Sequence, residues 1–101
     1  MLTNFRTYTL SLKLYKQIEC LKLPQHLKLQ ILRSSSSIAL NLAEGSGRAT
    51  AKDKKKFYQT SFASALETQA IVELGRIKDF EICDRINHIQ RSILNLIKNT
   101  R

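Results

Sequence analysis

Apolar and polar residues recur along the chain with helical spacing over four long segments. In the first, residues 4–21, apolar side chains return at steps of three and four residues, which places them on one face of a helix. These residues are Phe5, Tyr8, Leu12, Leu14, Tyr15, Ile18 and Leu21. The first helix should end before Pro24, because proline is tolerated only near the start of a helix.

The second segment, residues 25–45, contains four consecutive serines at positions 34–37. Its aliphatic face is formed by Leu27, Ile31, Ile38 and Leu42. If the helix continues through the serines, Ser34 and Ser35 fall on this same face. Serine is a mediocre helix former, so four in a row need a packing reason. We expect their small size to let another helix approach closely.

The third segment, residues 51–74, begins with a variant of the capping signature. Thr50 stands before it, and Asp53 follows three residues later where Glu or Gln is usual. Gly75 is placed to end this helix. The segment is therefore predicted to be one helix of about 24 residues, consistent with the few Gly and Pro residues in the chain.

A turn at residues 45–50 folds the second and third helices against each other. This turn predicts that Ser34 lies near Ser61 and that Ile31 lies near Ser64. The third helix has small residues there as well: Ser61, Ala63, Ser64 and Ala65. Small residues at the same level on the second and third helices predict a close contact between these helices. Ser35→Leu is therefore expected to destabilise the protein by about 1–3 kcal/mol.

The fourth segment, residues 79–99, begins with Asp79, a good N-cap. Its apolar face is formed by Ile82, Ile86, Ile89, Ile93 and Leu96, and its polar face by Arg85, His88, Arg91 and Asn95. All connections are short, which predicts helices of alternating direction. The expected fold is all-α, a single domain over residues 1–101 built as an antiparallel up-down-up-down four-helix bundle.

Composition adds a strong charge signal to this picture. Seventeen Lys and Arg against eight Asp and Glu give a net charge of +9, which favours polyanionic partners. The alternative is a small soluble protein whose basic charge has no function. No run of residues is apolar enough for a membrane span and no secretory signal is present, so we expect a cytoplasmic protein without membrane contact. Cys20 and Cys83 are expected to be reduced thiols.

Alternating helix directions would collect basic residues at one end of the bundle. The predicted nucleic-acid-binding residues are Arg6, Arg48, Lys52, Lys54, Lys55, Lys56, Lys98 and Arg101. These eight cations share that end with two acids, a net charge of +6. Four of them lie in the first turns of the third helix, where the helix dipole disfavours cations and free N–H groups favour phosphate. A solvated charge run is the alternative interpretation.

The stretch before this cluster is predicted to be structural. Glu44 lies near the negative C-terminus of the second helix, and we expect it to face Arg48 or the start of the third helix. Asn41, one turn earlier, is expected to hydrogen-bond into the same cluster. Gly45 and Gly47 complete the motif, which lacks the Gly-Lys-Ser/Thr ending of a phosphate-binding P-loop.

No catalytic constellation is evident, so we expect no enzyme, no metal site and no cofactor. His26 and His88 have no ligand at metal-binding spacing. No two acids form an obvious general acid/base pair. Arg85 and His88 lie three residues apart, slightly too close for the Arg and His of helical ribonucleases, which leaves a nuclease as the least favoured alternative.

The segment at residues 37–48, Ser-Ile-Ala-Leu-Asn-Leu-Ala-Glu-Gly-Ser-Gly-Arg, resembles the motif of a family of small bacterial four-helix bundle proteins. These are the large-subunit rRNA intervening-sequence proteins and the accessory variability determinant proteins of diversity-generating retroelements. Gln30, Arg33 and the Leu-Glu-Thr-Gln at residues 66–69 are similar to further family features. Ala39 stands where the family usually has proline, and Ala65 where an acid is common.

The resemblance implies a homopentameric barrel. In the retroelement branch it also implies binding to a reverse transcriptase and to RNA or cDNA. Since the chain is basic, the favoured function is a non-catalytic nucleic-acid-binding accessory scaffold. The alternative is a structural or protein-interaction module whose contacts are apolar, with Leu10 and Leu40 as candidate subunit contacts.

Overall fold

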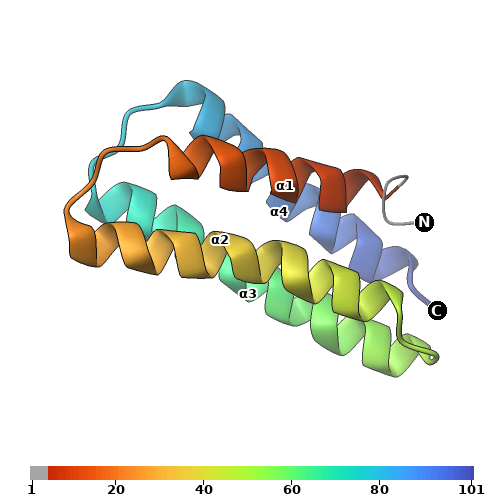
Figure 1. Cartoon of the computed structure of the whole chain (residues 1–101). Helices are drawn as coiled ribbons and strands as arrows, with labels where there is room; N and C mark the ends of the chain where they lie inside the picture. Colours follow the sequence, from red (N-terminus) through yellow and green to blue (C-terminus); the bar gives the residue numbers. More distant parts are fainter. Residues whose placement is uncertain (1–4) are drawn as a thin grey trace.

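The computed structural model describes residues 5–101 and contains four helices (Figure 1). They are α1 (Arg6–Glu19), α2 (Gln25–Ser46), α3 (Ala51–Leu74) and α4 (Phe80–Asn99). Residues 5–101 contain no strand, so the all-α class is confirmed over that range. The helix boundaries agree with the sequence prediction to within about two residues, except that the predicted start of the first helix at residue 4 lies outside the described residues.

The N-termini of α3 and α4 are capped by the predicted side chains. Thr50 Oγ1 accepts a hydrogen bond from the Asp53 N–H at 3.1 Å, and Asp79 Oδ1 accepts one from the Ile82 N–H at 3.1 Å. Each bond satisfies one of the N–H groups that a helix start leaves free. The capping predictions are therefore confirmed at both helices.

α3 ends at Leu74 with Gly75 as its C-cap, as predicted, but the left-handed residue that follows is an arginine. Gly75 is the C-cap residue, but its φ is −80°, and the left-handed residue is Arg76, with φ 54°. The N–H of Arg76 bonds the Glu73 carbonyl at 3.1 Å, and the N–H of Ile77 bonds the Val72 carbonyl at 3.0 Å. This is the Schellman pattern with arginine where glycine is usual.

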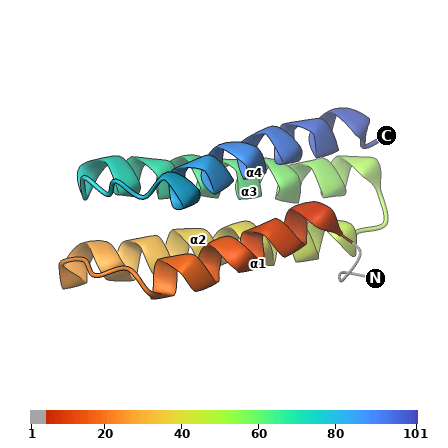
Figure 2. The same cartoon turned by 90° about the horizontal axis from the view of Figure 1, so that it is seen from above.

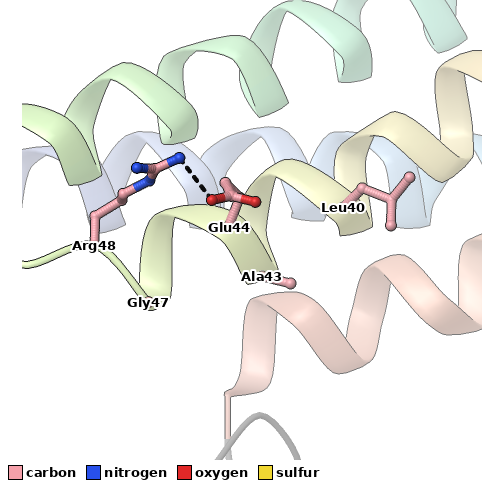
Figure 3. Close-up of a pocket in the computed structure, with 5 residues that line it drawn as sticks. All are labelled: Leu40, Ala43, Glu44, Gly47 and Arg48. Carbon is pink, nitrogen blue, oxygen red and sulfur yellow. Dashed lines mark ion pairs between the residues drawn. The ribbon is translucent and has the colours of Figure 1, made fainter.

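The C-termini of α1 and α2 are satisfied by neighbouring groups. Lys28 Nζ donates to the carbonyls of Ile18 (3.2 Å), Glu19 (2.8 Å) and Leu21. A cation is favourable there because the C-terminal carbonyls carry the negative end of the helix dipole. α2 ends at Ser46, and the N–H of its C-cap residue Gly47, labelled in Figure 3, bonds the Glu44 carbonyl at 3.2 Å.

Side-chain hydrogen bonds between helices show how the helices pass one another. They include Ser34–Thr68 and Ser37–Ser64 between α2 and α3, and Thr7–Ser92 and Gln17–Arg85 between α1 and α4. In each pair of helices the residue numbers rise on one helix as they fall on the other. Figures 1 and 2 place the start of α1, the α2–α3 turn and the C-terminus at the same end of the molecule.

The core is a column of aliphatic side chains contributed by all four helices. The buried members at its centre are Leu14, Ile18, Ile31, Ile38, Leu42, Ala65, Ile71, Val72, Ile82, Ile86, Ile89 and Ile93. Leu96, predicted to continue the face of α4, is only partly buried. Among residues 5–101, no helix has both the length and the apolar character needed to cross a bilayer.

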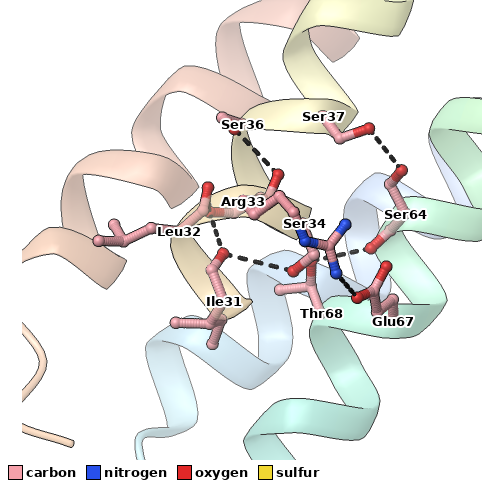
Figure 4. Close-up of polar contacts among 10 residues, drawn as sticks. Ile31, Leu32, Arg33, Ser34, Ser36, Ser37, Ser64, Glu67 and Thr68 are labelled. Atoms are coloured by element: carbon pink, nitrogen blue, oxygen red, sulfur yellow. Dashed lines mark hydrogen bonds and ion pairs between the residues drawn. The ribbon is translucent and has the colours of Figure 1, made fainter. Parts of the chain in front are cut away.

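The serine segment of α2 packs in the interior, as predicted. Ser34 and Ser35 have no exposed surface, and Ser61 on α3 has none either. Ser34 Oγ lies 2.8 Å from Thr68 Oγ1, and Ser37 Oγ lies 2.8 Å from Ser64 Oγ (Figure 4). The small side chains therefore allow α2 and α3 to meet through paired hydroxyls.

The predicted register of this contact is wrong. Ser34 meets Thr68 instead of Ser61, and Ser61 donates at 2.8 Å to the Ile38 carbonyl. α2 runs to Ser46, one residue past its predicted end, which shifts the register of the two helices. Side chains also tilt toward the N-terminus of their own helix. In two helices of opposite direction the tilts add to a shift of about two residues, which accounts for part of the difference from the backbone count. Ala63 is also exposed instead of lying in the contact.

Candidate functional site

The eight predicted nucleic-acid-binding residues belong to segments that meet at one end of the molecule, here named the basic end. Arg6 begins α1, Arg48 lies in the α2–α3 turn, and Lys98 lies in the last turn of α4. Figures 1 and 2 bring these segments together, although they are distant in the sequence. The exposed members are Arg6, Arg48, Lys52, Lys56, Lys98 and Arg101, while Lys54 and Lys55 are half-buried.

Arg48 is held by two contacts within the basic end. Its Nη2 lies 2.7 Å from Glu44 Oε2, the ion pair expected from the sequence (Figure 3). Its guanidinium carbon also lies 4.5 Å from the centre of the Phe57 ring, a cation–π contact. Glu44 therefore offsets part of the charge of Arg48, and the guanidinium lies fixed over an aromatic face.

Lys54 differs from the other lysines of α3. Its Nζ donates to the Ser46 carbonyl at 3.1 Å, at the C-terminus of α2. The ammonium group thus stabilises the negative end of one helix dipole while lying in the first turn of the next. Within residues 5–101, Lys52, Lys56 and Lys98 are exposed and form no ion pair, so they are the lysines of the basic end most available to a ligand, and Lys55 is unpaired but half-buried.

Asn41 does not join the Glu44–Arg48 cluster, contrary to expectation. Its Nδ2 donates to the Ser37 carbonyl at 2.9 Å and to Ser37 Oγ at 3.0 Å. The reason is geometric: Ser37 is one turn earlier on the same helix face, within reach of a short amide. Asn41 therefore extends the hydroxyl network between α2 and α3.

The two glycines of the motif have different surroundings. Gly45 is buried, and a Cβ added there would lie 2.6 Å from Tyr58 Cε1 and 3.2 Å from Phe57 Cβ. Gly47 is exposed, and a Cβ there would meet only backbone oxygens at 3.7 Å or more. The glycine at position 45 therefore lets α2 and α3 meet closely, whereas position 47 has room for a side chain.

The aromatic residues beside the lysines belong to the interior. Tyr58 is 4% exposed, and its ring contacts Phe5 edge-on with centres 6.4 Å apart. Burial raises the pKa of the Tyr58 phenol above its ordinary value. Phe57 is half-buried under Arg48. A stacking platform for bases is therefore not formed by these two rings.

A shallow hollow between α1 and α4 was not foreseen from the sequence. It is lined by Arg6, His88, Arg91, Ser92 and Asn95. The sequence placed three of these on the polar face of the fourth helix, but only the packing of α1 against that helix shows that Arg6 joins them. Within residues 5–101 no group of His, Cys, Asp and Glu is arranged to hold a metal ion, and both cysteines are free thiols.

Comparison with known proteins identifies one family. The model of the 23S rRNA-intervening sequence protein family matches residues 4–100. No curated protein matches the chain, and no solved structure does. The matched range includes all four helices and every residue of the basic end except Arg101.

Proposed function

The chain belongs to the 23S rRNA-intervening sequence protein family, and from that premise we propose that it is a basic, non-catalytic scaffold that binds nucleic acid. In this proposal it acts in the cytoplasm as an accessory of a diversity-generating retroelement, in contact with a reverse transcriptase and with RNA or cDNA. The scaffold is an antiparallel up-down-up-down bundle that assembles into a homopentameric barrel. Five basic ends at one rim would then face a single polyanion.

The observation that carries the proposal is the composition of the basic end. Six of its eight cations are exposed, and they come from three segments of the chain. Only Arg48 among them forms an ion pair within residues 5–101. Exposed cations that repel one another cost stability in the free protein, and a phosphate backbone offsets that repulsion.

Three lysines of α3 test this proposal. In Lys52→Gln/Lys55→Gln/Lys56→Gln, the capping contact of Lys54 is kept and three positive charges are lost. The matched control is Lys22→Gln/Arg76→Gln/Lys78→Gln, which removes three exposed cations in the α1–α2 and α3–α4 connections. Both variants have the same net charge, so a difference between them reports position and not total charge.

The measurement is fluorescence anisotropy of a labelled 20-nucleotide single-stranded RNA between 50 and 200 mM KCl. Each lost phosphate contact reduces the slope of log affinity against log salt by about 0.7, so the α3 variant should lose about 2 in slope. The control should keep the slope of the original protein. Equal losses in both variants would show that binding follows total charge, and the basic end would not be the site.

The assembly is tested separately by sedimentation equilibrium. Five copies of the 11.6 kDa chain have a mass of about 58 kDa. A mass of one or two chains would refute the pentamer without deciding whether the protein binds RNA.

A structural or protein-interaction module is the second candidate, favoured by exposed apolar side chains. Leu40 is 68% exposed on the motif helix α2, and in Figure 3 it points away from the Glu44–Arg48 pair. For such a module the RNA would not be retained at 150 mM salt by the unmodified protein. Leu40→Ser would then weaken assembly or partner binding, while the lysine variant would not.

A further inference from the structure

The hollow between α1 and α4 is the strongest unassigned feature of the molecule. Four of its lining residues lie on α4 at spacings of three and four, so they share one helix face: His88, Arg91, Ser92 and Asn95. Arg6, in the first turn of α1, completes the lining. α1 and α4, which are distant in the sequence, therefore both contribute hydrogen-bond donors to the hollow.

A hydrogen bond joins the two helices beside the hollow, between the lining residue Ser92 and Thr7. Thr7 Oγ1 and Ser92 Oγ lie 2.5 Å apart, and Thr7 is 5% exposed. Further along the same pair of helices, Arg85 Nε donates to Gln17 Oε1 at 2.8 Å. These contacts hold α1 against α4, so Arg6 and Arg91 extend from a rigid support.

The hollow contains positive charge without a compensating acid. None of its lining residues is Asp or Glu. The ion pairs of residues 5–101 are Arg33–Glu67, Arg48–Glu44 and Arg85–Glu81. Arg6 and Arg91 take part in none of them. Their guanidinium groups thus keep their full donor capacity beside the donors of His88 and Asn95.

We propose that this hollow binds a phosphate group, with Arg6 and Arg91 as its charged donors and His88 and Asn95 as further donors. A phosphate has several acceptor oxygens and can take hydrogen bonds from both helices at once, and arginine matches it with two parallel bonds. One source of that phosphate is the backbone of a nucleic acid, and for this source the inference rests on the proposed function. The other source is a free phosphorylated compound.

The two histidines of the chain make the site directly observable. His88 lines the hollow, whereas His26 lies exposed in the first turn of α2, at the opposite end of the bundle. Inorganic phosphate is added at constant pH and ionic strength while the ring Cε1–H signals of both histidines are followed by NMR. The signal of His88 should shift with a saturating curve, and that of His26 should serve as the internal control.

Variants then assign the site to the arginines. Arg91→Gln should weaken the phosphate dependence of the His88 signal by about tenfold or more, since a charge-assisted hydrogen bond is lost. Arg76→Gln, an exposed arginine after α3, should leave it unchanged. Equal, unsaturating shifts of both histidines, or an unchanged curve in Arg91→Gln, would overturn the site.

A second titration, with RNA, distinguishes a nucleic-acid backbone from a free phosphorylated compound as the source of the phosphate. It also tests this site separately from the proposed function. A 12-nucleotide oligouridylate is titrated into the protein, into Arg6→Gln/Arg91→Gln and into the control Lys16→Gln/Arg76→Gln. A selective loss in the first variant supports the site with a nucleic-acid backbone as the source. A phosphate response of His88 in a protein that binds no RNA would support the site with a free phosphate and refute the proposed function. RNA binding without any response of His88 would overturn the site alone.

Discussion

Gly45 provides the sharpest test of how α2 and α3 meet. In Gly45→Ala the new methyl group would lie 2.6 Å from Tyr58 Cε1 and 2.8 Å from Tyr58 Cδ1, inside contact distance. The ring cannot move away freely, because Tyr58 is 4% exposed and packs edge-on against Phe5. The substitution therefore forces the two helices apart or the ring out of its position.

The magnitude follows from two opposing effects. Inserting a methyl group into a tightly packed contact costs about 1–3 kcal/mol. Replacing glycine by alanine inside a helix contributes about 0.5–1 kcal/mol in the other direction. Gly45→Ala is thus expected to lower the free energy of unfolding by about 1–2 kcal/mol. The melting temperature of a domain of this size falls by about 4–8 °C for each kcal/mol.

Urea denaturation followed by circular dichroism measures this effect, with Gly47→Ala as the matched control. A Cβ at position 47 meets only the Glu44 and Ala43 carbonyl oxygens, at 3.7 and 3.9 Å, so the control should stay within about 0.5 kcal/mol of the original protein. In a Tyr58→Leu background the cost of Gly45→Ala should fall by about 1 kcal/mol, because the ring atoms are gone. A neutral or stabilising Gly45→Ala in both backgrounds would refute the reasoning.

Three further substitutions test the helix contacts and helix ends by the same denaturation assay. Ser35→Leu should destabilise by about 1–3 kcal/mol, because Ser35 has no exposed surface, and a neutral result would contradict the close contact. Lys28→Met should cost about 1–2 kcal/mol by releasing three carbonyls at the end of α1, whereas Lys22→Met should cost little, and equal effects would mean that the cap is unimportant. Arg76→Gly should stabilise by about 0.5–1 kcal/mol, since the left-handed conformation is strained for arginine, and Arg76→Ala should show no gain.

Local chemistry explains why the helix boundaries could be predicted from the sequence. Thr50 and Asp79 cap because a short polar side chain reaches the N–H three residues on, a relation contained in the sequence itself. The burial of Ser34 and Ser35 followed from helical periodicity for the same reason. For both caps the hydrogen-bond partner lies within one turn of the capping residue, and for the serines the helical face is set by the spacing of their own segment.

Contacts between helices were predicted less well, because they depend on how each helix is rotated and tilted. The backbone count placed Ser34 against Ser61, but its partner is Thr68, and the tilt of the side chains accounts for only about two of these seven residues. The contact of Lys54 with the Ser46 carbonyl needed the exact path of the turn. The hollow of Arg6 and Arg91 required the pairing of the first helix with the last, which no local pattern specifies.

The paired hydroxyls between α2 and α3 have a consequence for alignment. Aliphatic contacts repeat every turn, so sliding one rod along the other by a turn would exchange one isoleucine contact for a similar one. The same slide would break the Ser34–Thr68 and Ser37–Ser64 hydrogen bonds, at a cost of about 0.5–1.5 kcal/mol for each. Ser34 and Thr68 would keep only their bonds to carbonyls of their own helices. The paired hydroxyls therefore favour one alignment of α2 and α3 over the alignments shifted by a turn, and in that alignment Lys54 reaches the Ser46 carbonyl.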